Sequence, residues 1–146
     1  MHTTPSAAAP APVARTGWRD PRRWLAIYAI ALAAVAFWPV PVDSGMGGLL
    51  AAISAAVPWL SYAVIEVTAN VVLFVPLGTL LAMVLPRRRW LVVPIAAVVT
   101  VLIELAQAIF LAQRTPSLRD ILANTLGAVI GLAIVVVSER RSRQRA

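Results

Sequence analysis

The chain has 146 residues, of which 60% are hydrophobic, and its mean hydropathy is +0.83. This composition is more apolar than that of a soluble domain and leaves room for one small helical bundle. All thirteen basic residues are arginines, the net charge is +7, and the arginines cluster beside apolar runs, which argues against a nucleic-acid-binding surface. The lack of cysteine excludes thiolate chemistry, and the only histidine, His2, offers no internal imidazole for catalysis or metal binding.

The N-terminal segment, residues 1–23, is predicted to be a disordered basic cytoplasmic tail. It is rich in Ala, Pro and Thr and then carries four arginines. The first membrane span is predicted at residues 24–37 or 24–40. The Ala-Val-Ala sequence at 34–36 resembles a signal-peptide cleavage site, so removal of this segment is the competing interpretation.

The next apolar run, residues 46–60, is short and is broken by glycines and by Pro58. It predicts a short helix that lies in the membrane interface or re-enters it. The second span is predicted at residues 62–85. Glu66 and Asn70 lie in its first turns, and Pro76 lies near its middle, where a kink is expected.

The third span is predicted at residues 90–110, with Thr100, Glu104 and Gln107 late in it. A polar loop that contains Arg114 follows.

The fourth span is predicted at residues 119–137, with Asp120 and Asn124 in its first two turns. Residues 139–146 form a second basic cytoplasmic tail, and residues 24–138 form the membrane domain. Gly127 and Gly131 are spaced as in helices that approach each other closely in membranes.

The arginines predict the topology. Four lie before the first span, three between the second and third, and four after the fourth, so eleven share one side. The positive-inside rule places that side in the cytoplasm. The predicted fold is an all-α integral membrane protein with four transmembrane helices, both termini cytoplasmic, and a short interfacial or re-entrant helix between the first and second spans.

This topology brings the polar ends of the last three spans to the outer side, within roughly 10 Å of the interface at the rise of an α-helix. The residues concerned are Glu66, Asn70, Glu104, Gln107, Asp120 and Asn124. Glu66 and Asn70 are four residues apart, as are Asp120 and Asn124, so each pair shares a helix face. Charged groups at a helix centre cost roughly 2.5–3.5 kcal/mol in a membrane, so their convergence predicts a site.

A pattern over residues 66–131 resembles two signatures of the VanZ-like family. The first is carried by Glu66, Asn70, Phe74, Pro76 and Gly78. The second is carried by Thr100, Glu104, Gln107, Arg114, Asp120, Asn124, Thr125, Gly127 and Gly131. Thr100 stands where the family usually has Ser, and Ser117 and Arg119 occupy a stretch that is often acidic. The resemblance implies a small multi-pass protein of the bacterial plasma membrane, from a family linked to glycopeptide (teicoplanin) resistance, with no agreed biochemical activity.

The polar side chains of the predicted site fall into candidate acid–base residues and candidate substrate-binding residues. Glu66, Glu104 and Asp120 are candidate acids or bases. The residues expected to bind the substrate are Asn70, Thr100, Gln107, Arg114 and Asn124. Of these, Arg114 is expected to bind a phosphate or carboxylate group. Carboxylates and carboxamides also suit Mg²⁺ beside a phosphate, but no metal site is assigned and the cofactor is unknown.

Four interpretations stay open. The first is an enzyme that cleaves or transfers head groups on lipid-linked phosphates. The second is a non-catalytic protein that binds or assembles with an envelope lipid or partner. An ion pathway is disfavoured because the inner halves of the spans are apolar. The fourth is structural: interhelical hydrogen bonds, and an Asp120 that only caps its helix. The expected partners are membrane lipids or a lipid-linked envelope precursor, with a helix-mediated oligomer left open.

Overall fold

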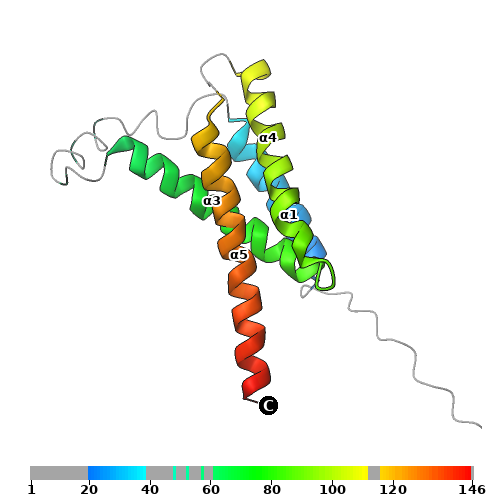
Figure 1. Cartoon of the computed structure of the whole chain (residues 1–146). Helices are drawn as coiled ribbons and strands as arrows, with labels where there is room; N and C mark the ends of the chain where they lie inside the picture. The colour runs from blue at the N-terminus through cyan, green and yellow to red at the C-terminus, as the bar shows by residue number, and fades with distance from the viewer. Residues whose placement is uncertain are drawn as a thin grey trace, which may run out of the picture.

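The computed structural model describes residues 20–38, 61–111 and 116–145, together with the single positions 48, 52 and 57. Over these residues the chain is helical and has no strand (Figure 1). The helices are α1 (Pro21–Ala36), α3 (Tyr62–Val84), the short 3-10 helix η2 (Arg89–Leu91), α4 (Val92–Phe110) and α5 (Leu118–Gln144). The predicted interfacial or re-entrant helix at 46–60 falls, apart from those single positions, outside the described residues.

Helix α1 begins three residues before the predicted span. The Asp20 carboxylate accepts a hydrogen bond from the Arg22 N–H at 3.0 Å, and Pro21 occupies the first helical position, where its missing N–H costs nothing. The helix ends at Ala36, and the N–H of Phe37 bonds back to the carbonyl of Ala33.

Among the described residues, three helices are long and apolar enough to cross a membrane, at Ala63–Val84, Arg89–Phe110 and Leu118–Gln144. The predicted all-α membrane fold is confirmed at this level. The 16 residues of α1 extend for roughly 24 Å, less than the roughly 30 Å of a hydrocarbon core, so the first of the four predicted spans stays a prediction.

Helices α3 and α5 cross obliquely and in close contact (Figure 1). A Cβ atom added at Gly78 would lie 2.3 Å from the carbonyl oxygen of Ala128, and one at Gly127 would lie 2.2 Å from that of Val71. A Cβ at Gly131 would lie 2.2 Å from the carbonyl oxygen of Val75. The close helix approach predicted from Gly127 and Gly131 is therefore confirmed, since backbone occupies the space that a side chain would need.

The apolar core draws on all four main helices. Phe74 of α3 is 2% exposed and Val92 of α4 is fully buried. They pack in one cluster with Leu32 of α1 and Val135 of α5. Because Phe74 also lies directly against Gly127, the same contact both fills the core and fixes the crossing of α3 and α5.

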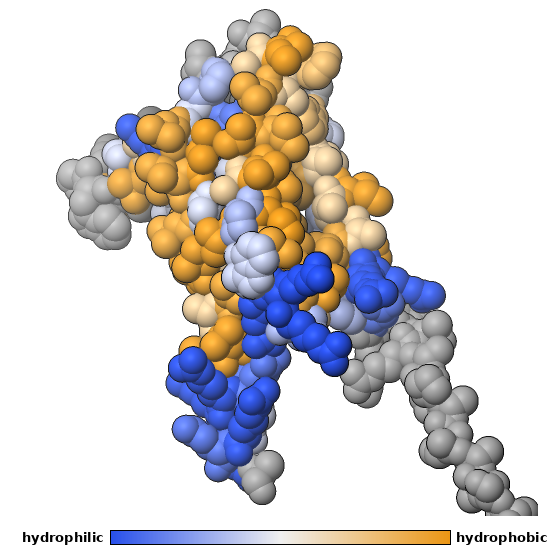
Figure 2. All heavy atoms as spheres, turned by 45° about the vertical axis from the view of Figure 1, so that its right-hand side comes forward, coloured by the Kyte–Doolittle hydropathy of each residue, from blue (hydrophilic) through white to orange (hydrophobic). Residues whose placement is uncertain are grey.

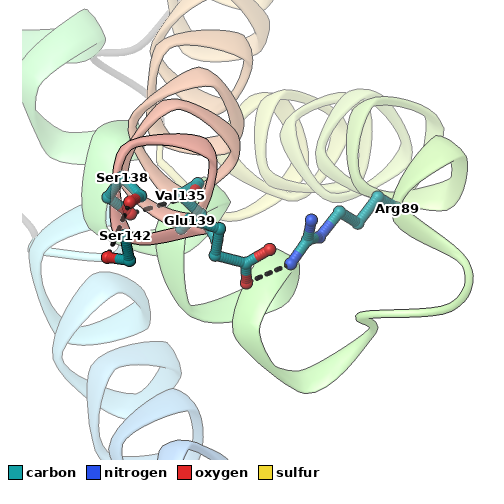
Figure 3. Close-up of polar contacts among 5 residues, drawn as sticks. All are labelled: Arg89, Val135, Ser138, Glu139 and Ser142. Carbon is teal, nitrogen blue, oxygen red and sulfur yellow. Dashed lines mark hydrogen bonds and ion pairs between the residues drawn. The ribbon is translucent and has the colours of Figure 1, made fainter. Parts of the chain in front are cut away.

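The described arginine clusters gather at one end of the bundle. The start of α1, the connection from α3 to α4 and the end of α5 all lie toward the lower part of Figure 1, and the hydrophilic atoms collect there in Figure 2. At this end the Arg89 guanidinium donates to the Glu139 carboxylate at 2.5 Å, which ties the α3–α4 connection to α5 (Figure 3). The C-terminal end of α4 and the beginning of α5 lie at the opposite, upper end.

Candidate functional site

The buried polar side chains of the described residues come from only two helices. They are Thr100, Glu104 and Gln107 of α4 and Asn124 of α5, which are 0%, 5%, 7% and 5% exposed. The sequence assigned all four to the candidate site. Because α4 and α5 run antiparallel, the last turns of α4 lie beside the first turns of α5 (Figure 1). This group is called the polar cluster below.

A hydrogen bond joins the two helices inside the polar cluster. The Asn124 amide nitrogen donates to the Thr100 hydroxyl oxygen at 2.7 Å, and both residues are buried. The Asn124 carboxamide oxygen is also buried, and no described residue provides it with a donor. A buried acceptor without a donor is costly, so this oxygen marks the place where the cluster has capacity for a ligand.

Glu104 lies against the beginning of α5. Its carboxylate accepts a hydrogen bond from the N–H of Ser117 at 2.8 Å, and Ser117 is the N-cap of α5. The Ser117 hydroxyl accepts in turn from the N–H of Asp120, in the first turn, at 3.4 Å. The N–H groups and the dipole at a helix N-terminus favour oxygen acceptors, so the Glu104 side chain is placed to complete the capping of α5.

Gln107 connects the cluster to α1. Its amide nitrogen donates to the carbonyl oxygen of Ala36 at 2.8 Å, in a buried contact. Ala36 is the last residue of α1, where backbone carbonyls lack partners within their own helix. Gln107 therefore fixes the end of α1 against α4.

Glu66 and Asn70 take no part in these three interhelical bonds. Both are half-buried on α3, and Asn70 directly precedes Val71, whose carbonyl packs against Gly127. The first half of α3 extends from this crossing away from α1 and α4 (Figure 1). Asn70 thus lies at the edge of the α3–α5 crossing, and Glu66 lies one turn further along α3.

The remaining assigned residues have different outcomes. Asp120 is half-buried in the first turn of α5, where an acid is stabilised by the helix dipole, in agreement with its structural interpretation. Arg114, which was predicted to bind an anion, lies outside the described residues. The described part of the chain holds no group of three His, Cys, Asp or Glu that could bind a metal ion.

Two groups that form hydrogen bonds with the polar cluster were not predicted from the sequence. The carbonyl of Ala36 and the N–H of Ser117 are backbone groups, which carry no residue-specific signal. Ser117 had an available signal, because Ser three residues before Asp is a helix-capping pattern.

Comparison with known proteins places this arrangement in a family. The family model described as VanZ/LLP1 matches residues 25–139, a range that includes all of α3 and α4 and every residue of the polar cluster. The searches of curated proteins and of solved structures gave no match.

Proposed function

The chain belongs to the VanZ/LLP1 family, and from this premise we propose that it binds the phosphorylated head group of a lipid or lipid-linked envelope precursor at the outer face of the bacterial plasma membrane. It is a VanZ-like membrane protein, and an association with glycopeptide resistance comes with that family. The observation that carries the proposal is the polar cluster, whose four side chains are the buried polar side chains of the described residues and extend from the middle of α4 toward its end.

The composition of the cluster supports a ligand site over simple helix packing. Interhelical hydrogen bonds in membranes contribute about 0.6–2 kcal/mol each, and Thr100 with Asn124 accounts for one of them. Glu104 is different, because a glutamine could accept the same bond from Ser117 without a buried charge. Burial of a carboxylate costs more free energy than burial of a carboxamide, and this cost supports a functional role for Glu104.

The position of the arginines supports the outward orientation. The arginine clusters lie at the end of the bundle opposite to the end of α4 and the beginning of α5 (Figure 1), the parts of these helices that carry Glu104, Gln107 and Asn124. With the arginine end in the cytoplasm, the polar cluster lies near the outer head groups. A lipid phosphate reaches that depth without leaving the bilayer.

In the proposed site Arg114 binds the phosphate through its planar guanidinium. In the sequence, Arg114 follows the last residue of α4 by four residues and precedes the first residue of α5 by four. Gln107 and Asn124 orient the head group, with the unpartnered Asn124 oxygen as the acceptor, and Asn70 contributes from α3.

A second candidate function is cleavage or transfer of the head group. The feature that favours it is a pair of carboxylates near the Glu104–Ser117 hydrogen bond, Glu104 on α4 and Asp120 in the first turn of α5, with Glu66 on α3 as a third candidate. One carboxylate would take the proton of a water or acceptor hydroxyl as its oxygen bonds to phosphorus. A second, protonated carboxyl would give its proton to the leaving oxygen as the bond from that oxygen to phosphorus breaks, so that the departing group leaves as an alcohol.

Binding is tested by the lipids that the protein retains. Wild type, Arg114→Ala and the matched control Arg119→Ala would be purified in membrane-mimetic particles and their lipids identified by mass spectrometry. We expect a phosphorylated species enriched in wild type and in Arg119→Ala and lost in Arg114→Ala. Equal lipid content in all three samples would contradict the proposal.

Chemistry is tested separately with Glu104→Gln. The amide oxygen can still accept from the Ser117 N–H, so the beginning of α5 is preserved while proton transfer is abolished. If Glu104 is the base, cell envelopes with this variant accumulate the precursor lipid while the purified variant still retains it. An unchanged ratio of precursor to product would count against Glu104 as the base and leave binding as the function.

A further inference from the structure

An apolar groove runs between α1 and α3, away from the polar cluster. Its volume is about 450 Å³, which is within the size range of ligand sites, and its lining exposes no polar surface. The lining includes Trp24, Ile27, Tyr28 and Ala31 of α1 and Pro76 and Leu80 of α3.

The groove is apolar because its polar groups bond within the protein. The Tyr28 hydroxyl donates to the carbonyl of Leu73, which also holds α1 against α3. The Thr79 hydroxyl donates to the carbonyl of Val75 at 2.9 Å, and Pro76 has no N–H to donate. The groove therefore suits an apolar ligand such as a hydrocarbon chain.

Arginines lie in the first turn of α1 and just after the end of α3, the two helices that form the groove. Arg23 precedes Ile27 by four residues and so lies on the same face of α1, one turn toward the N-terminus. Arg87 follows the last turn of α3, and both arginines are exposed. The two helices that form the apolar groove thus each have an exposed arginine toward the arginine end of the bundle.

We propose that this groove binds one acyl chain of an anionic phospholipid, whose phosphate is held by Arg23 and Arg87. The charge of these two arginines selects the lipid, because basic residues between membrane helices bind anionic head groups. The occupant comes from the leaflet at the arginine end, so the site is distinct from the polar cluster and independent of the function proposed for it.

The test uses the full chain in particles that contain equal amounts of phosphatidylglycerol and phosphatidylcholine. After transfer to detergent, native mass spectrometry measures the retained lipids. Wild type is expected to retain phosphatidylglycerol selectively. Arg23→Gln should lower that retention about fivefold, from the roughly tenfold per 1.4 kcal/mol relation and the typical contribution of one basic residue. Arg141→Gln, at the far end of α5, is the control and should retain the wild-type amount.

A second pair of variants tests the groove itself. Ala31 lines it, and Ala33, two residues away, does not. Both side chains are exposed, so a phenylalanine at either position leaves the core intact. Ala31→Phe should displace the acyl chain and release phosphatidylglycerol, while Ala33→Phe should retain it, with equal helix content by circular dichroism. Equal retention by these two variants, or wild-type retention of phosphatidylcholine equal to that of phosphatidylglycerol, would overturn the proposal.

Discussion

Replacement of Gly127 by alanine tests the crossing that holds α3 against α5. The added methyl carbon would lie 2.2 Å from the Val71 carbonyl oxygen and 2.9 Å from the Phe74 Cβ, whereas ordinary contact begins at 3.4 Å. The nearest atom belongs to the backbone, so no rotamer change relieves the clash. The helices would have to separate by roughly 1 Å, which an interior packed to near-crystalline density resists.

Two free energies of opposite sign decide the result. Alanine favours a helix over glycine by about 1 kcal/mol, which would stabilise α5 if the position were open. Overpacking of a filled interface costs about 1–3 kcal/mol and occasionally more, and a backbone contact at 2.2 Å belongs at the upper end. We therefore expect Gly127→Ala to lower the free energy of unfolding by about 2 kcal/mol.

The assay is reversible unfolding in mixed detergent micelles, followed by circular dichroism. Gly48→Ala is the matched control, since a Cβ at Gly48 meets nothing within 4 Å. The control should unfold within about 0.5 kcal/mol of wild type, as surface changes usually do. A Gly127→Ala protein as stable as wild type would refute the close crossing of α3 and α5.

The other pairwise contacts give smaller effects. Asn124→Ala should cost about 0.6–2 kcal/mol of unfolding free energy, and in a double-mutant cycle with Thr100→Ala the two losses should not add, because one hydrogen bond is shared. Additive losses would show that the bond contributes nothing. Glu139→Gln should lower the free energy of unfolding only slightly, since the partly exposed pair with Arg89 lies at the water-facing end, and the loss should shrink in high salt. A salt-independent loss would contradict that origin. In unfolding, Glu104→Gln should stay within about 1 kcal/mol of wild type because its bond to the Ser117 N–H is preserved, whereas Glu104→Leu should cost more.

Several helix limits could be predicted because the end of an apolar run coincides with a cluster of arginines. The predicted second span at 62–85 matches α3, Tyr62–Val84, since its apolar run ends at three arginines. The third span likewise ends at Phe110 as predicted. Where hydropathy alone was used, the observed limit differs from the predicted one. Helix α5 continues to Gln144, beyond the predicted residue 137, because hydropathy finds the membrane portion of a helix and arginine and glutamate are good helix formers in water.

The polar cluster could be predicted as a set but not as a network. Helical spacing placed Thr100, Glu104 and Gln107 on one face of α4, and all three are buried. Their partners depend on how the helices cross. Gln107 bonds to a backbone carbonyl of α1, which the sequence does not distinguish from any other carbonyl. Glu66 shares its helix with Asn70, yet the oblique path of α3 carries the start of that helix away from α4 (Figure 1). Periodicity within one helix holds no information on that angle.

The outward position of the polar cluster is tested most directly by single-cysteine labelling, because the natural chain has no cysteine. Gln113→Cys lies between α4 and α5, and Ser142→Cys lies in the last turn of α5 at the arginine end. A maleimide that cannot cross membranes should label Gln113→Cys in intact cells and Ser142→Cys only after the cells are permeabilised. The reverse pattern would place the polar cluster in the cytoplasm and contradict a site for outer-leaflet lipids.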